Sequence, residues 1–129
     1  MSFSFKTHQA SPNRTVVYLD GRLDAQTYQE ADRRFDDLLR NSPEMVTLVM
    51  DLGNLNYISS AGLRSIFRVR KTVTERNGMA LLVNMQPQVR KVFDVVKAVP
   101  INEVFASEAE LEGYLDSLQK RYREDNDGF

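Results

Sequence analysis

The chain has 129 residues, 42% of them hydrophobic, and this length and composition suit one domain with a single core. The formal net charge of −1 and the sequence pI of about 5.8 exclude a strongly charged surface that attracts nucleic acid or anionic lipid by bulk electrostatics. We therefore expect no direct contact with nucleic acid, and any protein partner must recognise a local surface.

The chain has no cysteine, which excludes disulfides, thiolate zinc sites and cysteine catalysis and is typical of a reducing compartment. His8 is the only histidine, so we expect no metal site and no cofactor. The N-terminal segment lacks the continuous apolar core of a signal peptide, and no segment is apolar enough over a sufficient length to span a bilayer. These features predict a cytoplasmic protein without membrane insertion.

The sequence pattern in the first half of the chain predicts three strands and one helix. Residues 3–6 predict a short edge strand, followed by a turn and a second strand over residues 15–20. A helix then begins near Gln26, and its apolar residues recur at helical spacing: Tyr28, Ala31, Phe35, Leu38 and Leu39. The run over residues 47–51 is almost wholly hydrophobic, which predicts a central strand covered on both faces.

The second half predicts two more strands and three helices. A helix begins near Ser60 and ends at Asn77-Gly78, a pair favoured at helix ends. Residues 79–83 predict a fourth strand of the same buried type, and Pro87 is well placed in the first turn of the helix that follows.

The last elements are short. Residues 101–105 predict a final strand, and Ser107 to Glu110 predict a capping box before a helix that extends to Leu118. From Gln119 the chain is charged and polar. We therefore predict a single domain over residues 1–118 and a flexible tail over residues 119–129.

This alternation of strands and helices predicts an α/β fold. We expect a central mixed sheet of about five strands, largely parallel with an antiparallel N-terminal hairpin, flanked by about four helices. Functional residues of open sheets collect in the loops after the carboxyl ends of the strands. Asp24 and the pair Ser59-Ser60 follow predicted strands, so we expect them at one edge of the sheet.

Ser59 and Ser60 lie at the N-terminus of a predicted helix, where a serine is either a cap or a modifiable site. A cap contributes about 0.5 to 2 kcal/mol. A phosphoserine adds about −1.5 to −2 charge and three acceptor oxygens, which the unpaired N–H groups of a helix N-terminus tolerate. For Ser59 the cap is the favoured interpretation, and Asp24 can likewise cap the helix near Gln26 while contributing to a docking surface.

Three separated stretches resemble the STAS domain, the family of bacterial anti-sigma factor antagonists and of the cytoplasmic modules of sulfate transporters. The stretches are Val17-Tyr18-Leu19-Asp20-Gly21-Arg22-Leu23-Asp24, the run from Asp51-Leu52 through Tyr57-Ile58-Ser59-Ser60-Ala61-Gly62-Leu63, and Val89-Arg90-Lys91-Val92-Phe93-Asp94. Their order and spacing extend the resemblance over roughly Val16 to Leu118. The fold that the resemblance implies is the STAS fold, in agreement with the predicted elements.

The resemblance also implies a regulatory site. In the antagonists, a serine in an Asp-Ser-Ser/Thr-Gly-Leu motif is phosphorylated by an anti-sigma factor kinase of the GHKL type and dephosphorylated by a serine phosphatase. Counting back from Gly62 places the acceptor at Ser60, with Ser59 as second choice. Ser59 stands where the family has aspartate, and Ala61 where it has a hydroxyl residue. The implied partner-binding residues are Asp24, Ser59, Ser60, Ala61, Gly62, Leu63 and Arg64.

The resulting hypothesis is a non-enzymatic anti-sigma factor antagonist that binds an anti-sigma factor kinase when unphosphorylated and thereby frees a sigma factor. The alternative is a stand-alone STAS scaffold subunit of a lipid-transport or stressosome-like assembly, in which Ser60 need not be modified. A hydrolase is disfavoured because Ser60 lacks a Gly-x-Ser-x-Gly elbow. We expect a monomer or weak homodimer.

A basic cluster follows the acceptor motif on the second predicted helix: Arg64, Arg68, Arg70 and Lys71. It either complements an acidic partner or is the solvated face of that helix.

Overall fold

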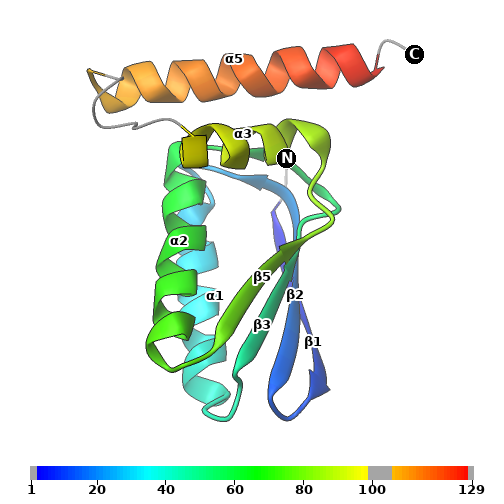
Figure 1. The fold of residues 1–129 in the computed structure, drawn as a ribbon, viewed down its shortest axis with the longest axis vertical. Helices are drawn as coiled ribbons and strands as arrows, with labels where there is room; N and C mark the ends of the chain where they lie inside the picture. The colour runs from blue at the N-terminus through cyan, green and yellow to red at the C-terminus, as the bar shows by residue number, and fades with distance from the viewer. Residues whose placement is uncertain (1–2, 99–105, 128–129) are drawn as a thin grey trace.

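The computed structural model describes residues 3–98 and 106–127, in which a mixed sheet is flanked by helices (Figure 1). The strands are β1 Ser4–Ser11, β2 Arg14–Leu23, β3 Thr47–Asp51, β4 Leu55–Ile58 and β5 Met79–Val83. The helices are α1 Tyr28–Asn41, α2 Ser60–Glu75, α3 Pro87–Ala98 and α5 Glu108–Asp127. The predicted strand over residues 101–105 lies outside the described residues.

The strand order is β1-β2-β3-β5, and β4 pairs with β2 beside this path. β1 runs antiparallel to β2, whereas the other pairings are parallel. This confirms the predicted mixed sheet with an N-terminal hairpin. The sequence did not predict β4, because its residues, 55–58, are too few to show a strand period.

On the side away from β1, the long strand β2 pairs with two strands in turn. Its first half, from Arg14 to Tyr18, pairs with β3, and its end, from Gly21 to Leu23, pairs with β4. The register shifts beside Gly21, whose φ of 94° is a conformation that glycine adopts without steric cost. This bulge turns the end of β2 toward β4, and so toward the start of α2.

Helices α1 and α2 cover the same face of the sheet (Figure 1). In β3, Leu48 and Met50 are fully buried, whereas Thr47 and Val49 on the opposite face are only half-buried. The expectation that β3 is covered on both faces is therefore wrong. The core lies between the sheet and the helices, and its largest fully buried members are Phe35, Leu19, Leu23, Met45, Leu48, Met50, Leu52, Leu55, Ile58, Ile66, Leu115 and Val17.

Among the described residues, the strand β5 lies at an edge of this sheet, not in its interior. Met79 is 57% exposed and Leu81 is 41% exposed, so the prediction of a fourth fully buried strand is wrong. Its hydrophobic run reflects one face packed on the core and one face left open.

The C-terminal helix α5 lies across the end of the molecule where the parallel strands finish, against α3 and α2 (Figure 1). The sequence places the start of a flexible tail at Gln119, but this residue is 2% exposed and lies inside α5. That part of the prediction is wrong because the Gln119 side chain is fully hydrogen-bonded to distant backbone. Within the described residues, no helix combines the length and the apolar character that crossing a membrane requires.

Candidate functional site

The ends of β2 and β4 bring the predicted site residues together. Leu23 pairs with Ile58, and the next N–H group, from Ser59, donates to the Leu23 carbonyl at 3.0 Å. Asp24 therefore directly follows β2 and Ser59 directly follows β4, so both leave the sheet at the same edge. The expected meeting of these two segments is present, although Ser59 follows β4 and not β3.

Ser59 is the N-cap of α2. Its backbone is extended, with φ −98° and ψ 178°, and its Oγ accepts a hydrogen bond from the Gly62 N–H at 3.2 Å. The Leu63 N–H donates to the Ser59 carbonyl at 2.9 Å, which closes the first turn. Ser59 is 4% exposed, so the cap interpretation describes its position well.

Ser60 is the first residue of α2, and both of its donors face a carboxylate. Its Oγ donates to Glu112 Oε2 at 2.5 Å. The backbone nitrogen of Ser60 lies 3.3 Å from both carboxylate oxygens of Glu112. Ser60 is 6% exposed, because the Glu112 side chain reaches it from α5. The first turn of α2 has no acidic residue of its own, so Glu112 supplies the negative charge at this helix N-terminus.

The next residues of the motif position α2 against the sheet. A Cβ at Gly62 would overlap the Leu23 carbonyl oxygen and lie 2.9 Å from Ile58 Cγ1, so only glycine permits this approach. Ala61 and Leu63 are buried. Of the residues from Ala61 onward that the resemblance implies in partner binding, Arg64 alone is exposed.

Asp24 organises the turn before α1. Its Oδ1 accepts the Gln26 N–H at 3.0 Å, and its Oδ2 lies 3.3 Å from the Arg22 Nε. The Asp24 N–H donates to Thr27 Oγ1 at 2.9 Å. The expectation that Asp24 caps the helix is wrong, because α1 begins at Tyr28 with Thr27 as its N-cap, and Asp24 instead stabilises the turn before it. The half-buried carboxylate of Asp24 stands at the same edge as Ser59.

Tyr57 extends this polar edge toward α5. The Arg22 guanidinium lies over its ring, 4.0 Å from the centroid. Burial raises the pKa of the Tyr57 hydroxyl, and the charge of Asp116 and a hydrogen bond to it raise the pKa further. The charge of Asp116 thus links Tyr57 electrostatically to α5.

Comparison with known proteins agrees with this geometry. The family model for the STAS domain matches residues 6–111, most of the chain. The chain belongs to the STAS domain family. Ser60, which the resemblance to the family implies as acceptor, is the residue that meets Glu112.

Solved STAS structures share the fold at low identity. An anti-sigma factor antagonist from Mycobacterium paratuberculosis superposes with a TM-score of 0.66 at 19% identity, covering 95% of each chain. The anti-sigma factor antagonist SpoIIAA in its unphosphorylated form gives 0.60 at 20% identity, covering 71% of this chain and 83% of that one. The Bacillus SpoIIAA in its phosphorylated form also gives 0.60, at 19% identity, covering 72% of this chain and 83% of that one.

A curated relative is similar over a shorter stretch. The putative anti-sigma factor antagonist BtrV of Bordetella bronchiseptica is 46% identical over 48 residues, which are 37% of this chain. The match spans 41% of the length of that relative.

Three residues of this STAS edge were not predicted from the sequence: Glu112, Asp116 and Gln119. All three belong to α5 and recur at spacings of four and three, which place them on one side of a helix. That periodicity is visible in the sequence. Nothing local names their partners, however, because the contacts join residues 52 and 61 positions apart.

The basic cluster on α2 is partly engaged within the domain. Arg68 lies 2.9 Å from Asp36 and 3.5 Å from Asp32 of α1, and the hydrogen bond that Arg68 donates to Asp36 raises the pKa of Arg68. Arg68 thus joins α1 to α2 within the domain.

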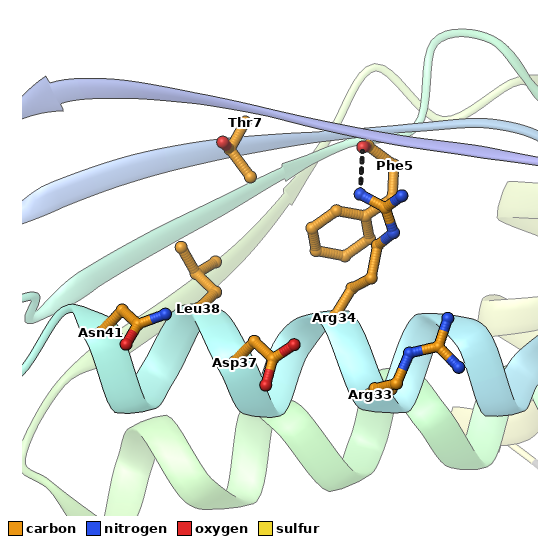
Figure 2. Close-up of a pocket in the computed structure, with 7 residues that line it drawn as sticks. All are labelled: Phe5, Thr7, Arg33, Arg34, Asp37, Leu38 and Asn41. Carbon is orange, nitrogen blue, oxygen red and sulfur yellow. Dashed lines mark hydrogen bonds between the residues drawn. The ribbon is translucent and has the colours of Figure 1, made fainter.

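A hollow of about 450 Å³ lies between β1 and α1, away from the STAS motif. Figure 2 shows Arg34 reaching across it, where its guanidinium donates to the Phe5 carbonyl at 3.5 Å. Arg34 also pairs with Glu30 at 3.5 Å. None of the predicted site residues lines this hollow. Within residues 3–98 and 106–127, no group of three or more histidine, aspartate or glutamate side chains is arranged to hold a metal ion.

Proposed function

We propose that this STAS protein is an anti-sigma factor antagonist whose affinity for an anti-sigma factor is switched by phosphorylation of Ser60. The observation that supports the proposal most directly is the place of Ser60 in the fold. It occupies the acceptor position of the STAS motif and is also the first residue of α2, where helix N–H groups tolerate a phosphate. Relatives in sequence and in structure are named anti-sigma factor antagonists, and one is described in a phosphorylated form.

The switch that we propose is a local change of charge. The unmodified edge presents the exposed Arg64 of α2 and the half-buried Asp24 to a partner. A phosphate on Ser60 would add negative charge beside the Asp24 edge, and the partner surface that fitted the neutral hydroxyl would be repelled. The N-terminal cap of α2 need not change, since Ser59 and not Ser60 caps this helix. This is a binding function and needs no catalytic residue.

The partner in this proposal is an anti-sigma factor that is also a serine kinase of the GHKL type, with a serine phosphatase to reverse the modification. The test is incubation of the purified chain with each GHKL-type serine kinase of the same organism and ATP, followed by phosphosite mapping by mass spectrometry. We expect phosphate on Ser60, its loss in Ser60→Ala and its retention in Ser59→Ala. Phosphate on neither serine would contradict the proposal.

Affinity is the second readout. We expect the unmodified chain to bind the kinase and the phosphorylated chain to be released, as measured by isothermal titration calorimetry with each form. Arg64→Ala should weaken binding because Arg64 is exposed beside the acceptor, whereas Arg40→Ala at the distant end of α1 should not. Equal affinity of the two forms would contradict the switch.

The burial of Ser60 favours a second candidate function. A hydroxyl that is 6% exposed and hydrogen-bonded to Glu112 is compatible with a STAS scaffold subunit in which this serine is structural. In that case affinity purification of the chain would recover lipid-transport or stressosome-like subunits, and no kinase would modify it.

A further inference from the structure

Helix α5 holds the junction between β4 and α2 by its polar side. Gln119 accepts the Ile58 N–H at 2.8 Å and donates to the Ile58 carbonyl at 2.7 Å, so its amide completes the backbone hydrogen bonding at the end of β4. Glu112 accepts both donors of Ser60. The carboxylate of Asp116, which lies between Glu112 and Gln119 in the sequence of α5, acts on Tyr57 through its charge. Ile58 and Ser60 are thus both hydrogen-bonded by side chains of α5.

The same helix also packs on the core through apolar side chains, with Leu111 partly buried against it. Leu115 is fully buried and Leu118 is 7% exposed, and both face the domain. Of the elements with described contacts to α5, α3 and α2 provide the most, and the sheet strands β1, β2, β3 and β5 are not among its main neighbours. In Figure 1 the helix lies across the end of the domain as a separate layer. Its attachment therefore combines apolar packing with the polar contacts of the junction.

Glu112 occupies the place that a phosphate on Ser60 would need. The carboxylate accepts the Ser60 N–H group, which is one of the free donors of the helix N-terminus. A phosphate attached to Ser60 Oγ would compete for these donors and would place two anions in direct contact. Because the phosphate is covalently bound to Ser60, the Glu112 carboxylate is the group that must move away.

We propose that α5 is a displaceable cover on Ser60, which a docking kinase must lift and which a phosphate on Ser60 expels through repulsion of Glu112. The proposal rests on the proposed function, since it takes Ser60 as the acceptor. In the unmodified protein the cover limits access to the acceptor. In the phosphorylated protein the start of α2 is uncovered, so modification changes the shape of the partner surface as well as its charge.

The first test needs no kinase. Phosphoserine is installed at position 60 during translation, and amide hydrogen exchange is followed by mass spectrometry in the modified and unmodified chains. We expect exchange of residues 107–121 to become about tenfold faster or more in the modified chain, together with the Ile58 amide that Gln119 holds, while β2 and β3 stay protected. Unchanged protection of residues 107–121 would overturn the proposal.

A matched pair of variants isolates the charge. Glu112→Gln keeps the size of the side chain but lets it donate to a phosphate, so phosphoserine at position 60 should no longer accelerate exchange of α5. Glu110→Gln makes the same chemical change at an exposed position of the same helix and should leave the acceleration intact. Undiminished acceleration in Glu112→Gln would overturn the repulsion mechanism.

Access is tested with the kinase that modifies the unaltered chain. Glu112→Gln should raise the initial rate of Ser60 phosphorylation severalfold over Glu110→Gln, because it weakens the charge-assisted contact that covers the hydroxyl. A rate that falls in Glu112→Gln would overturn the covering role. If no kinase modifies any form, the proposed function fails, whereas the exchange experiment still decides whether phosphate expels α5.

Discussion

Gly62 determines how closely α2 approaches the end of β2. Because a Cβ at this position would overlap the Leu23 carbonyl oxygen, Gly62→Ala must push the helix away from the strand. We expect a loss of about 1 to 3 kcal/mol in the free energy of unfolding, typical of overpacking. Urea denaturation followed by circular dichroism measures the change.

Gly113→Ala is the matched control for this substitution. Gly113 also lies in a helix, but a Cβ there meets no atom within 4 Å. Alanine should therefore stabilise α5 by up to about 1 kcal/mol through its higher helix propensity. Equal changes in the free energy of unfolding for the two substitutions would show that the close approach at Gly62 does not affect stability.

We expect Tyr57 to make the free energy of unfolding depend on pH in the alkaline range. Its pKa is raised in the folded protein by burial and by Asp116, whereas an unfolded tyrosine loses its proton near about pH 10. Below that pH, the contribution of the raised Tyr57 pKa to the free energy of unfolding is fully present. Above it, the unfolded state binds fewer protons than the folded state, so the free energy of unfolding falls. Tyr57→Phe should remove this part of the pH dependence.

The measurement is a set of urea denaturations of the two proteins between about pH 8 and about pH 11. The difference in the free energy of unfolding between the wild type and Tyr57→Phe should shrink as the pH rises. Since the variant retains the other tyrosines and all lysines, their titration cancels in the difference. A constant difference across this range would show that Tyr57 titrates normally.

At the scale of the elements, the two faces of the sheet differ in what they contribute. Leu48 of β3 is fully buried, whereas Leu81 of β5 is 41% exposed on the opposite face. We expect Leu48→Ala to reduce the free energy of unfolding by about 2 to 5 kcal/mol. Leu81→Ala, the same chemical change, should cost less than about 1 kcal/mol. Urea denaturation of both variants tests this, and similar losses would mean that the second face is also covered.

Hydrophobic patterns in the sequence predicted these elements but not their burial. The runs over residues 47–51 and 79–83 coincide with β3 and β5, because apolar residues in a short run suffice to indicate a strand. The same runs suggested two covered faces. Which residues are exposed depends on the number of layers, and that is set by where the helices pack.

The candidate site divides in the same way between local and distant information. Ser59 as a cap, Ser60 in the first turn and Asp24 at a turn before α1 are consequences of neighbouring residues, so their positions follow from the sequence. The contacts of Ser60 with Glu112 and of Ile58 with Gln119 join distant segments of the chain. In the sequence, Gln119 is simply the first residue of a polar stretch.

At the scale of the whole molecule, the sheet and α5 differ in how firmly they are held. β2 lies between β1 and β3 and is paired along its whole length, so its amides should exchange only through global unfolding. Helix α5 packs on α3 and α2 and is bound to the β4–α2 junction by side chains. We therefore expect α5 to open in a separate event of lower free energy, even in the unmodified chain.

Native-state hydrogen exchange in increasing, sub-denaturing urea distinguishes the two events. The opening free energy of α5 should be smaller than that of β2, and its dependence on urea should be weaker because less surface becomes exposed. Gln119→Ala should lower the opening free energy of α5 further by removing its hydrogen bonds to Ile58. Identical free energies and urea dependences for α5 and β2 would mean that the helix is an inseparable part of the core, and Ser60 would then become accessible only when the entire domain unfolds.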